Sequence, residues 1–179
     1  MLGILTLLLA LTPPTAPTLT ESEEATLAAR KPVVRTTQDS VLAVIDVAAP
    51  PSEVIAAVLD VEARKDEVGS IEKVTLYQDT AEKKAVRYDL SLMGFDAAMN
   101  LIYEIDSANH YVRYYTDDTQ DNDISGSAGS YHAVPLKMGA SRLYYRVDVP
   151  DSGPAFIKKA LLENNLPEQI QGIRARAEQ

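Results

Sequence analysis

The segment from residue 40 to residue 60 changes its hydrophobic period in the middle, and this change constrains the fold strongly. Its first part alternates between apolar and other residues, which predicts a strand at Ser40–Val47. The apolar face of this strand consists of Val41, Ala43, Ile45 and Val47. Pro50 and Pro51 then open a short helix, because the first turn of a helix tolerates a residue without a backbone N–H. The sequence therefore predicts a strand that passes through a rigid corner directly into a helix.

The remainder of the chain up to residue 149 has the pattern of short strands and turns. The expected strands are Ile71–Tyr77, Ala85–Leu92, Phe95–Ile105, Tyr111–Thr116, Ser125–Val134 and Ser141–Val149. Their connections are short, so neighbouring strands must be antiparallel, because a parallel pair needs a long crossover. With the strand at Ser40–Val47 this gives about seven strands, and Val33–Thr36 has the pattern of a further small one. Short helices are expected at Thr20–Arg30 and Asp60–Val68.

Two of these strands alternate clearly, which predicts a sheet with one apolar and one hydrated face. In the strand that ends at residue 149, Leu143 and Tyr145 share a face opposite Arg142 and Arg146. The last segment, Gly153–Glu178, carries a helical apolar stripe that can cover the apolar face. This stripe consists of Leu162, Leu166, Ile170, Ile173 and Ala177. Pro167 interrupts the segment, so a kink or break is expected near Asn164.

The first 16 residues differ in composition from the rest of the chain. Leu2–Leu11 is largely apolar and too short to span a bilayer, but it suits the core of a signal peptide. We expect cleavage after residue 16 and a periplasmic or secreted product; the alternatives are an uncleaved tail and a misassigned start of the chain. The chain has no cysteine, which excludes a lipoprotein anchor. The expected organisation is a signal peptide at 1–16, an extension with a short helix at 17–39 and one domain at 40–179.

Charge and residue types narrow the classes of function. Acidic residues outnumber basic ones by 26 to 17, and the net charge of −9 repels nucleic acids. The segment 121–126 imitates half of a calcium loop, but His132 stands where the loop needs a glutamate, so we expect an ordinary turn and no metal site. His110 is expected at a turn, and either Tyr131 or His132 should point inward. We assign no catalytic residue and expect no cofactor.

The order of elements resembles the helix-grip superfamily of START domains, polyketide cyclases and dehydrases, and coenzyme-Q-binding proteins (SRPBCC, Bet v 1-like). The stretches that carry the resemblance are IDVAAPPSEVIAAVLDVEA (45–63), SIEKVTLY (70–77), GSYHAVPL (129–136), SRLYYRVDV (141–149) and PAFIKKALLENNLPEQIQGIRARAE (154–178). It implies an α+β fold in which a curved antiparallel sheet wraps around a long C-terminal helix. After Asp60, relatives commonly continue with an aromatic and proline-rich segment, whereas this chain has Arg64 and Lys65 there.

The resemblance also implies an apolar cavity between the sheet and the C-terminal helix, although the same side chains could fill the core completely. The candidate ligand-binding residues are Val86, Tyr88, Leu90, Met99, Leu101, Tyr103, Val112, Tyr114, Leu143, Tyr145, Phe156, Leu162 and Leu166. Such a lining suits a lipid, an isoprenoid or a polyketide-like molecule. We expect a monomeric binding or carrier protein that contacts membranes transiently. The alternative is a cyclase or dehydrase-type enzyme that uses the same cavity.

Overall fold

The structure is a computed structural model that describes residues 11–37, 40–92, 94–148 and 166–179. Within these residues, one antiparallel sheet contains eight strands in the order β1-β2-β8-β7-β6-β5-β4-β3. The strands are β1 (Val33–Thr36), β2 (Ser40–Val47), β3 (Ile71–Asp79), β4 (Lys83–Leu92), β5 (Phe95–Asp106), β6 (Tyr111–Thr116), β7 (Ala128–Pro135) and β8 (Ser141–Asp148). The helices are α1 (Glu21–Ala28), α2 (Pro51–Leu59), α3 (Arg64–Glu67), the 3₁₀ turn η1 (Lys137–Gly139) and α5 (Leu166–Ala177).

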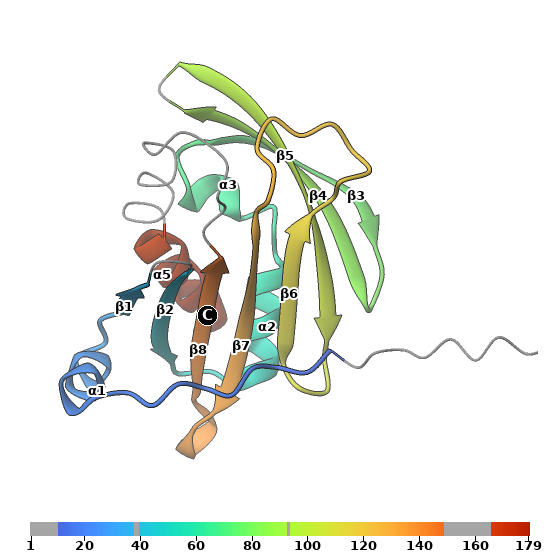
Figure 1. Cartoon of the computed structure of the whole chain (residues 1–179). Helices are drawn as coiled ribbons and strands as arrows, with labels where there is room; N and C mark the ends of the chain where they lie inside the picture. Colours follow the sequence, from blue (N-terminus) through green and yellow to red (C-terminus); the bar gives the residue numbers. More distant parts are fainter. Residues whose placement is uncertain (1–10, 38–39, 93, 149–165) are drawn as a thin grey trace, which may run out of the picture.

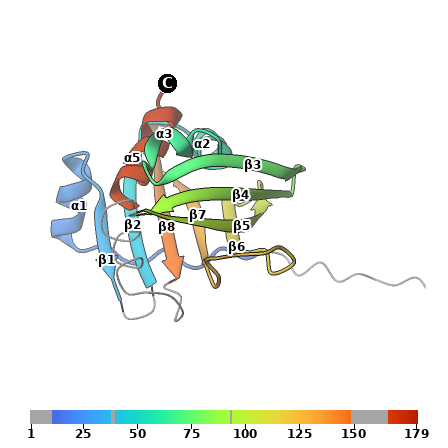
Figure 2. The same ribbon diagram turned by 90° about the horizontal axis from the view of Figure 1, so that it is seen from above.

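The sheet is strongly curved, and α2, α3 and α5 lie on the same side of it (Figures 1 and 2). We call this side the inner face. The core on the inner face joins α2 and α5 to the strands, with Val54, Val58, Ile170 and Ile173 fully buried. The arrangement confirms the predicted helix-grip fold. No helix in the described ranges is long and apolar enough to cross a membrane.

The proline corner forms as expected. Pro51 is the first residue of α2, and Glu53 lies in its first turn, where a carboxylate suits the positive end of the helix dipole. Helix α2 buries Val54, Ile55, Ala57 and Val58. The corner therefore turns the chain from the sheet onto its inner face within three residues of β2.

Several boundaries differ from the sequence prediction. A small strand at the edge, β1, brings the number of strands from about seven to eight. The expected helix at Asp60–Val68 shortens to the single turn of α3, and β7 begins at Ala128 instead of Ser125. The predicted C-terminal helix is described only as α5, with Pro167 in its first turn, where proline is tolerated. The part of that prediction before Leu166, and Val149, lie outside the described residues.

The loop before β7 explains the later start of that strand. The side chain of Asp123 accepts a hydrogen bond from the backbone N–H of Ala98 at 2.8 Å, and that of Asn122 accepts one from Asn100 at 2.6 Å. The part of β5 before Leu101 has no partner strand in β6, and side chains of the segment that imitates a calcium loop accept hydrogen bonds from its backbone N–H groups instead. This structural use of the segment agrees with the expected turn.

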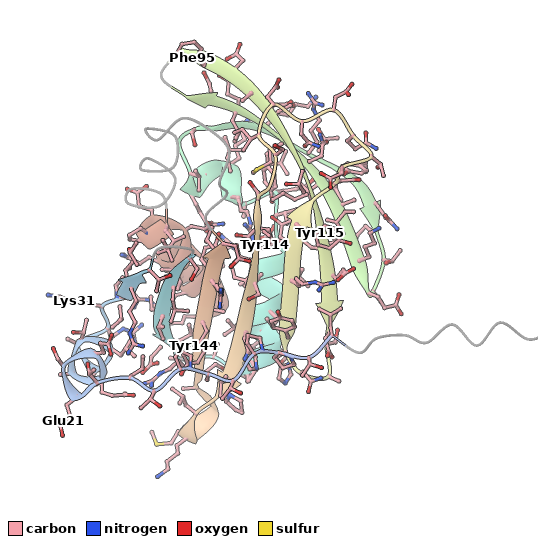
Figure 3. All side chains as sticks on the ribbon, viewed as in Figure 1. Glu21, Lys31, Phe95, Tyr114, Tyr115 and Tyr144 are labelled. Carbon is pink, nitrogen blue, oxygen red and sulfur yellow. The ribbon has the colours of Figure 1, made fainter. Side chains whose placement is uncertain are left out.

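The prediction of a hydrated opposite face was wrong at β2 and β8. There Leu27 of α1, Val33 and Val44 form a second buried cluster, against which Tyr144 packs (Figure 3). Arg142 strengthens this layer, because its guanidinium contacts Asp46 at 2.6 Å and Glu24 of α1 at 2.7 Å. The N-terminal extension thus covers part of the outer face.

Candidate functional site

The described members of the predicted ligand-binding set lie on the inner face. Ten of them belong to the main core: Val86, Tyr88, Leu90, Leu101, Tyr103, Val112, Tyr114, Leu143, Tyr145 and Leu166. Met99 is partly buried and packs against the same core. Phe156 and Leu162 lie outside the described residues. The strand alternation therefore predicted which side chains point inward, and their contact with a ligand stays a prediction.

Five buried tyrosines, one from each of the five neighbouring strands β4 to β8, meet in this core, and we call them the tyrosine cluster: Tyr88, Tyr103, Tyr114, Tyr131 and Tyr145. The hydroxyl groups of Tyr88 and Tyr103 lie 3.0 Å apart. The rings of Tyr131 and Tyr145, which are register partners in β7 and β8, stack with their centroids 4.2 Å apart. The cluster places polar hydroxyl groups inside an otherwise apolar interior.

Gly129 makes room for one member of the cluster. It is the register partner of Tyr114, and a Cβ atom at Gly129 would lie 2.5 Å from the Tyr114 hydroxyl and 2.3 Å from the backbone oxygen of Arg146. Real Cβ atoms do not approach other atoms so closely. The Tyr114 side chain can therefore lie over β7 because residue 129 has no side chain, and its hydroxyl reaches that of Tyr145 at 3.4 Å.

Arg64 is the central charged residue of the site, and sequence reasoning did not place it there. Helix α3 holds its side chain in the interior, where it is only 4% exposed. Its guanidinium carbon lies 5.5 Å from the ring centroid of Tyr103 and 5.4 Å from that of Tyr131. Its Nη1 donates a hydrogen bond to the hydroxyl of Tyr131 at 3.0 Å, and its Nη2 donates one to the carbonyl of Val58 at 2.9 Å.

Gln169 of α5, a helix that packs against α3, completes the polar arrangement. Its Nε2 lies 3.4 Å from the hydroxyl oxygen of Tyr131, so this oxygen accepts hydrogen bonds from both Arg64 and α5. The unusual sequence after Asp60 was the available signal for Arg64. For Gln169 the helical stripe gave no signal, because polar residues between apolar positions normally face solvent.

Burial disfavours the charged form of four tyrosines of the cluster. Loss of hydration raises the pKa of Tyr88, Tyr114, Tyr131 and Tyr145 well above the ordinary value of a phenol. The guanidinium of Arg64 is charged at any physiological pH. The site therefore combines one positive charge with neutral hydroxyl groups and can stabilise negative charge on an oxygen atom.

The two histidines lie away from this cluster. One residue of the pair Tyr131 and His132 in β7 was expected to point inward, and it is Tyr131. His132 packs edge-on against Tyr111, with ring centroids 5.9 Å apart. Tyr111 lies opposite His132 in the register of β6 and β7, on the outer face. His110 lies in the turn before β6 with a φ of 49°, as the sequence predicted for a turn residue.

A groove on the outer face has a volume of about 620 Å³. Its lining includes Tyr111, Tyr115 and Ser130, and the N-terminal residues Thr12 and Pro14 border it. Two arginines also line it, but Arg113 pairs with Glu104 and Arg146 pairs with Asp148 at 2.9 Å. The positive charges of both arginines in the groove are therefore already compensated by carboxylates. In the part of the chain that the structure describes, no group of three or more His, Cys, Asp or Glu side chains could hold a metal ion.

The comparisons with known proteins agree with this fold. The sequence matches no protein-family model and no curated protein. Among solved structures, the Zhui aromatase/cyclase from Streptomyces sp. R1128 is similar with a TM-score of 0.66 and 20% identity over 82% of this chain and 94% of that chain. A START superfamily protein from Mycobacterium smegmatis gives a TM-score of 0.61 and 18% identity over 78% and 97% of the two chains.

A third similar structure is the STAR-related lipid transfer protein from Xanthomonas axonopodis. Its TM-score is 0.63, with 13% identity over 82% of this chain and 92% of that chain. At identities this low, the structural likeness shows the fold alone, and it extends over nearly the whole length of each neighbour. The order of strands, the helices on the inner face and these likenesses agree, and the chain has the helix-grip fold that these solved structures share.

Proposed function

We propose that the protein binds a hydrophobic small molecule, such as a lipid, an isoprenoid or a polyketide-like compound, between the curved sheet and α5. The observation that carries this proposal is a polar cluster inside an apolar interior, centred on Arg64 and Tyr131. Arg64 has no carboxylate partner among the described residues, and a buried unpaired guanidinium is costly to desolvate, so a binding role accounts for this residue better than packing does. The likeness to a lipid transfer protein and an aromatase/cyclase supports the same class of ligand.

The proposal is tested by looking for the ligand and by blocking its site. Native mass spectrometry of the purified protein should show a bound lipid-like molecule that is recovered chemically unchanged. Leu101 is 4% exposed on the inner face of β5. Replacing it, Leu101→Arg, should weaken the binding of a fluorescent fatty acid more than tenfold, because a guanidinium in a dry interior is costly to desolvate.

Met138→Arg is the matched control, since the same charge is added at a side chain that is fully exposed in η1. This variant should bind the probe like the parent protein, and circular dichroism must show that both variants are folded. A folded parent protein that binds neither lipids nor apolar probes would refute the proposal. A new product that forms from the ligand would favour the cyclase or dehydrase alternative.

We also propose that the protein acts outside the cytoplasm. The apolar segment at Leu2–Leu11, followed by the small and proline-rich residues up to Ala16, supports export by a cleaved signal peptide. Apolar molecules dissolve poorly in water, so a protein that binds them can carry them across an aqueous compartment outside the cytoplasm.

A further inference from the structure

The charge of Arg64 is uncompensated among the described residues. No carboxylate in the described ranges lies within ion-pair distance of its guanidinium, and its buried Nε has no hydrogen-bond partner there. The nearby carboxylates of Glu67 and Asp60 pair with Arg176 instead. Buried polar atoms are nearly always satisfied in folded proteins, so an unpaired guanidinium nitrogen indicates a missing partner.

The surroundings of Arg64 define the chemistry of that partner. The guanidinium lies between two aromatic rings, and the hydroxyl groups near it are neutral phenols. A buried charge in such surroundings is strongly stabilised by an opposite charge. An anionic oxygen would supply the charge and could accept the hydrogen bond that the Nε of Arg64 has available.

Tyr131 and Gln169 add donors beside Arg64. The hydroxyl oxygen of Tyr131 accepts from Arg64 at 3.0 Å and lies 3.4 Å from the amide nitrogen of Gln169, so its own hydrogen must be donated elsewhere. In the ligand-free protein the hydroxyl of Tyr145 interacts with that of Tyr131, and a ligand oxygen next to Arg64 could accept the hydrogen instead. The residues farther along the inner face, such as Val86, Leu90 and Leu101, are apolar and suit a hydrocarbon body.

We propose that Arg64 and Tyr131, with Gln169 as the residue that orients the tyrosine, bind the anionic oxygen group of an otherwise apolar ligand. The ligand class is an amphiphile with one carboxylate or phosphate at the end of an apolar body, and an uncharged lipid is excluded as the preferred ligand. This inference rests on the proposed function and adds the selectivity of the site to it.

Matched probes separate the apolar contribution from the ionic one. cis-Parinaric acid and its methyl ester share one fluorescent polyene chain, and only the acid is charged at pH 7.5. The full-length protein should bind the acid at least tenfold more tightly than the ester, because a hydrogen bond to a charged group contributes about this much to affinity. A monoalkyl phosphate and a fatty acid of equal chain length, used as competitors, then decide which anion the site prefers.

Variants assign the preference to the residues. Arg64→Met should reduce the preference for the acid to less than threefold while the affinity for the ester stays within twofold of the parent value. Tyr131→Phe, which removes only the hydroxyl group, should reduce the preference in part. Arg87→Met is the control, because Arg87 is a part-exposed arginine of β4 that pairs with Asp89 outside the core.

Thermal unfolding provides a second readout. If Arg64 serves ligand binding, Arg64→Met in the ligand-free protein should keep or raise the melting temperature, because an uncompensated buried charge is replaced by an apolar side chain of similar length. If Arg64 serves packing, the melting temperature should fall by several degrees and the preference for the acid should not change.

The outcomes distinguish this inference from the proposed function. Equal, tight binding of acid and ester would leave the proposed function standing and overturn the inference. Failure of both probes to bind the folded parent protein would overturn both. An unchanged preference in folded Arg64→Met and Tyr131→Phe would also overturn it, because the anion would then be bound elsewhere, for instance by the arginines of the outer groove.

Discussion

At the scale of single residues, Tyr131 and His132 show how one strand separates two environments. Successive side chains of β7 point to opposite faces, so Tyr131 joins the core while His132 packs on Tyr111. Burial, and to a smaller extent the charge of His110, lowers the pKa of His132 below its usual value. Between the two pKa values the unfolded chain binds more protons than the folded protein, so the contribution of His132 to stability is complete above about pH 6.5 and falls as the pH drops below it.

We therefore predict that acidification from pH 7.5 to pH 5.5 lowers the melting temperature less in His132→Gln than in the parent protein. Differential scanning calorimetry at both pH values, with ligand-free protein, measures the effect. Binding of the fluorescent fatty acid should be unchanged in this variant, because His132 lies on the outer face. A melting temperature whose pH dependence is the same in both proteins would show that His132 does not lose a proton on folding.

At the scale of elements, α5 fixes the core to the inner face of the sheet. Ile170 and Ile173 are fully buried and pack against α2 and β2 in the main core, whereas Gln171 between them is exposed. Removing most of a buried isoleucine leaves a cavity and costs about 2–5 kcal/mol. We predict that Ile173→Ala lowers the free energy of unfolding by this amount, measured by chemical denaturation.

Gln171→Ala is the matched control on the same helix, and it should change the free energy of unfolding by less than about 0.5 kcal/mol. The difference between the two variants reports the packing of α5 and excludes an effect of alanine on the helix itself. A loss of less than 1 kcal/mol in Ile173→Ala would mean that α5 packs loosely on the sheet.

At the scale of the whole molecule, the N-terminal segment links the proposed export to the outer face. Thr12 and Pro14 lie at the groove beside Tyr111, and the segment 11–20 runs across the outer sides of the sheet (Figure 1). Cleavage after residue 16 would remove both residues from the groove and leave 179 − 16 = 163 residues. We predict that the intact mass of the protein recovered from the periplasm or medium corresponds to a chain that begins near Pro17.

A substitution in the apolar segment provides the control for this prediction. Leu8→Arg should interrupt the signal and leave the protein uncleaved in the cytoplasm, because an arginine disrupts an apolar run of about ten residues. Recovery of exported parent protein with residues 1–16 still attached would contradict cleavage, and the segment would then be a permanent cover of the groove.

Much of the fold could be predicted from hydrophobic period alone. Alternation placed β2 and β6 at their observed residues, and the proline corner placed α2 after β2. The period was informative because a strand or helix with one buried face must repeat its apolar residues at the spacing of that structure. The cover of the outer face by α1 could not be predicted in this way, since α1 buries only Leu27 and has no apolar stripe.

The sequence by itself therefore determined most of the elements, the antiparallel direction of successive strands and the inward direction of the tyrosines on β4, β5, β6 and β8. It predicted a simple meander, and the pairing of β2 with β8 instead of β3 was decided by the tertiary structure. The tertiary structure alone decided the polar part of the candidate site. Arg64 lies in a four-residue helix, too short for a period to reveal which way its side chains point. Its direction depends on how α3 packs against α5 and β3, and its partner Tyr131 is 67 residues away. Contacts between residues so distant in the chain exist only after the sheet has curved around the helices, and so no local pattern could encode them.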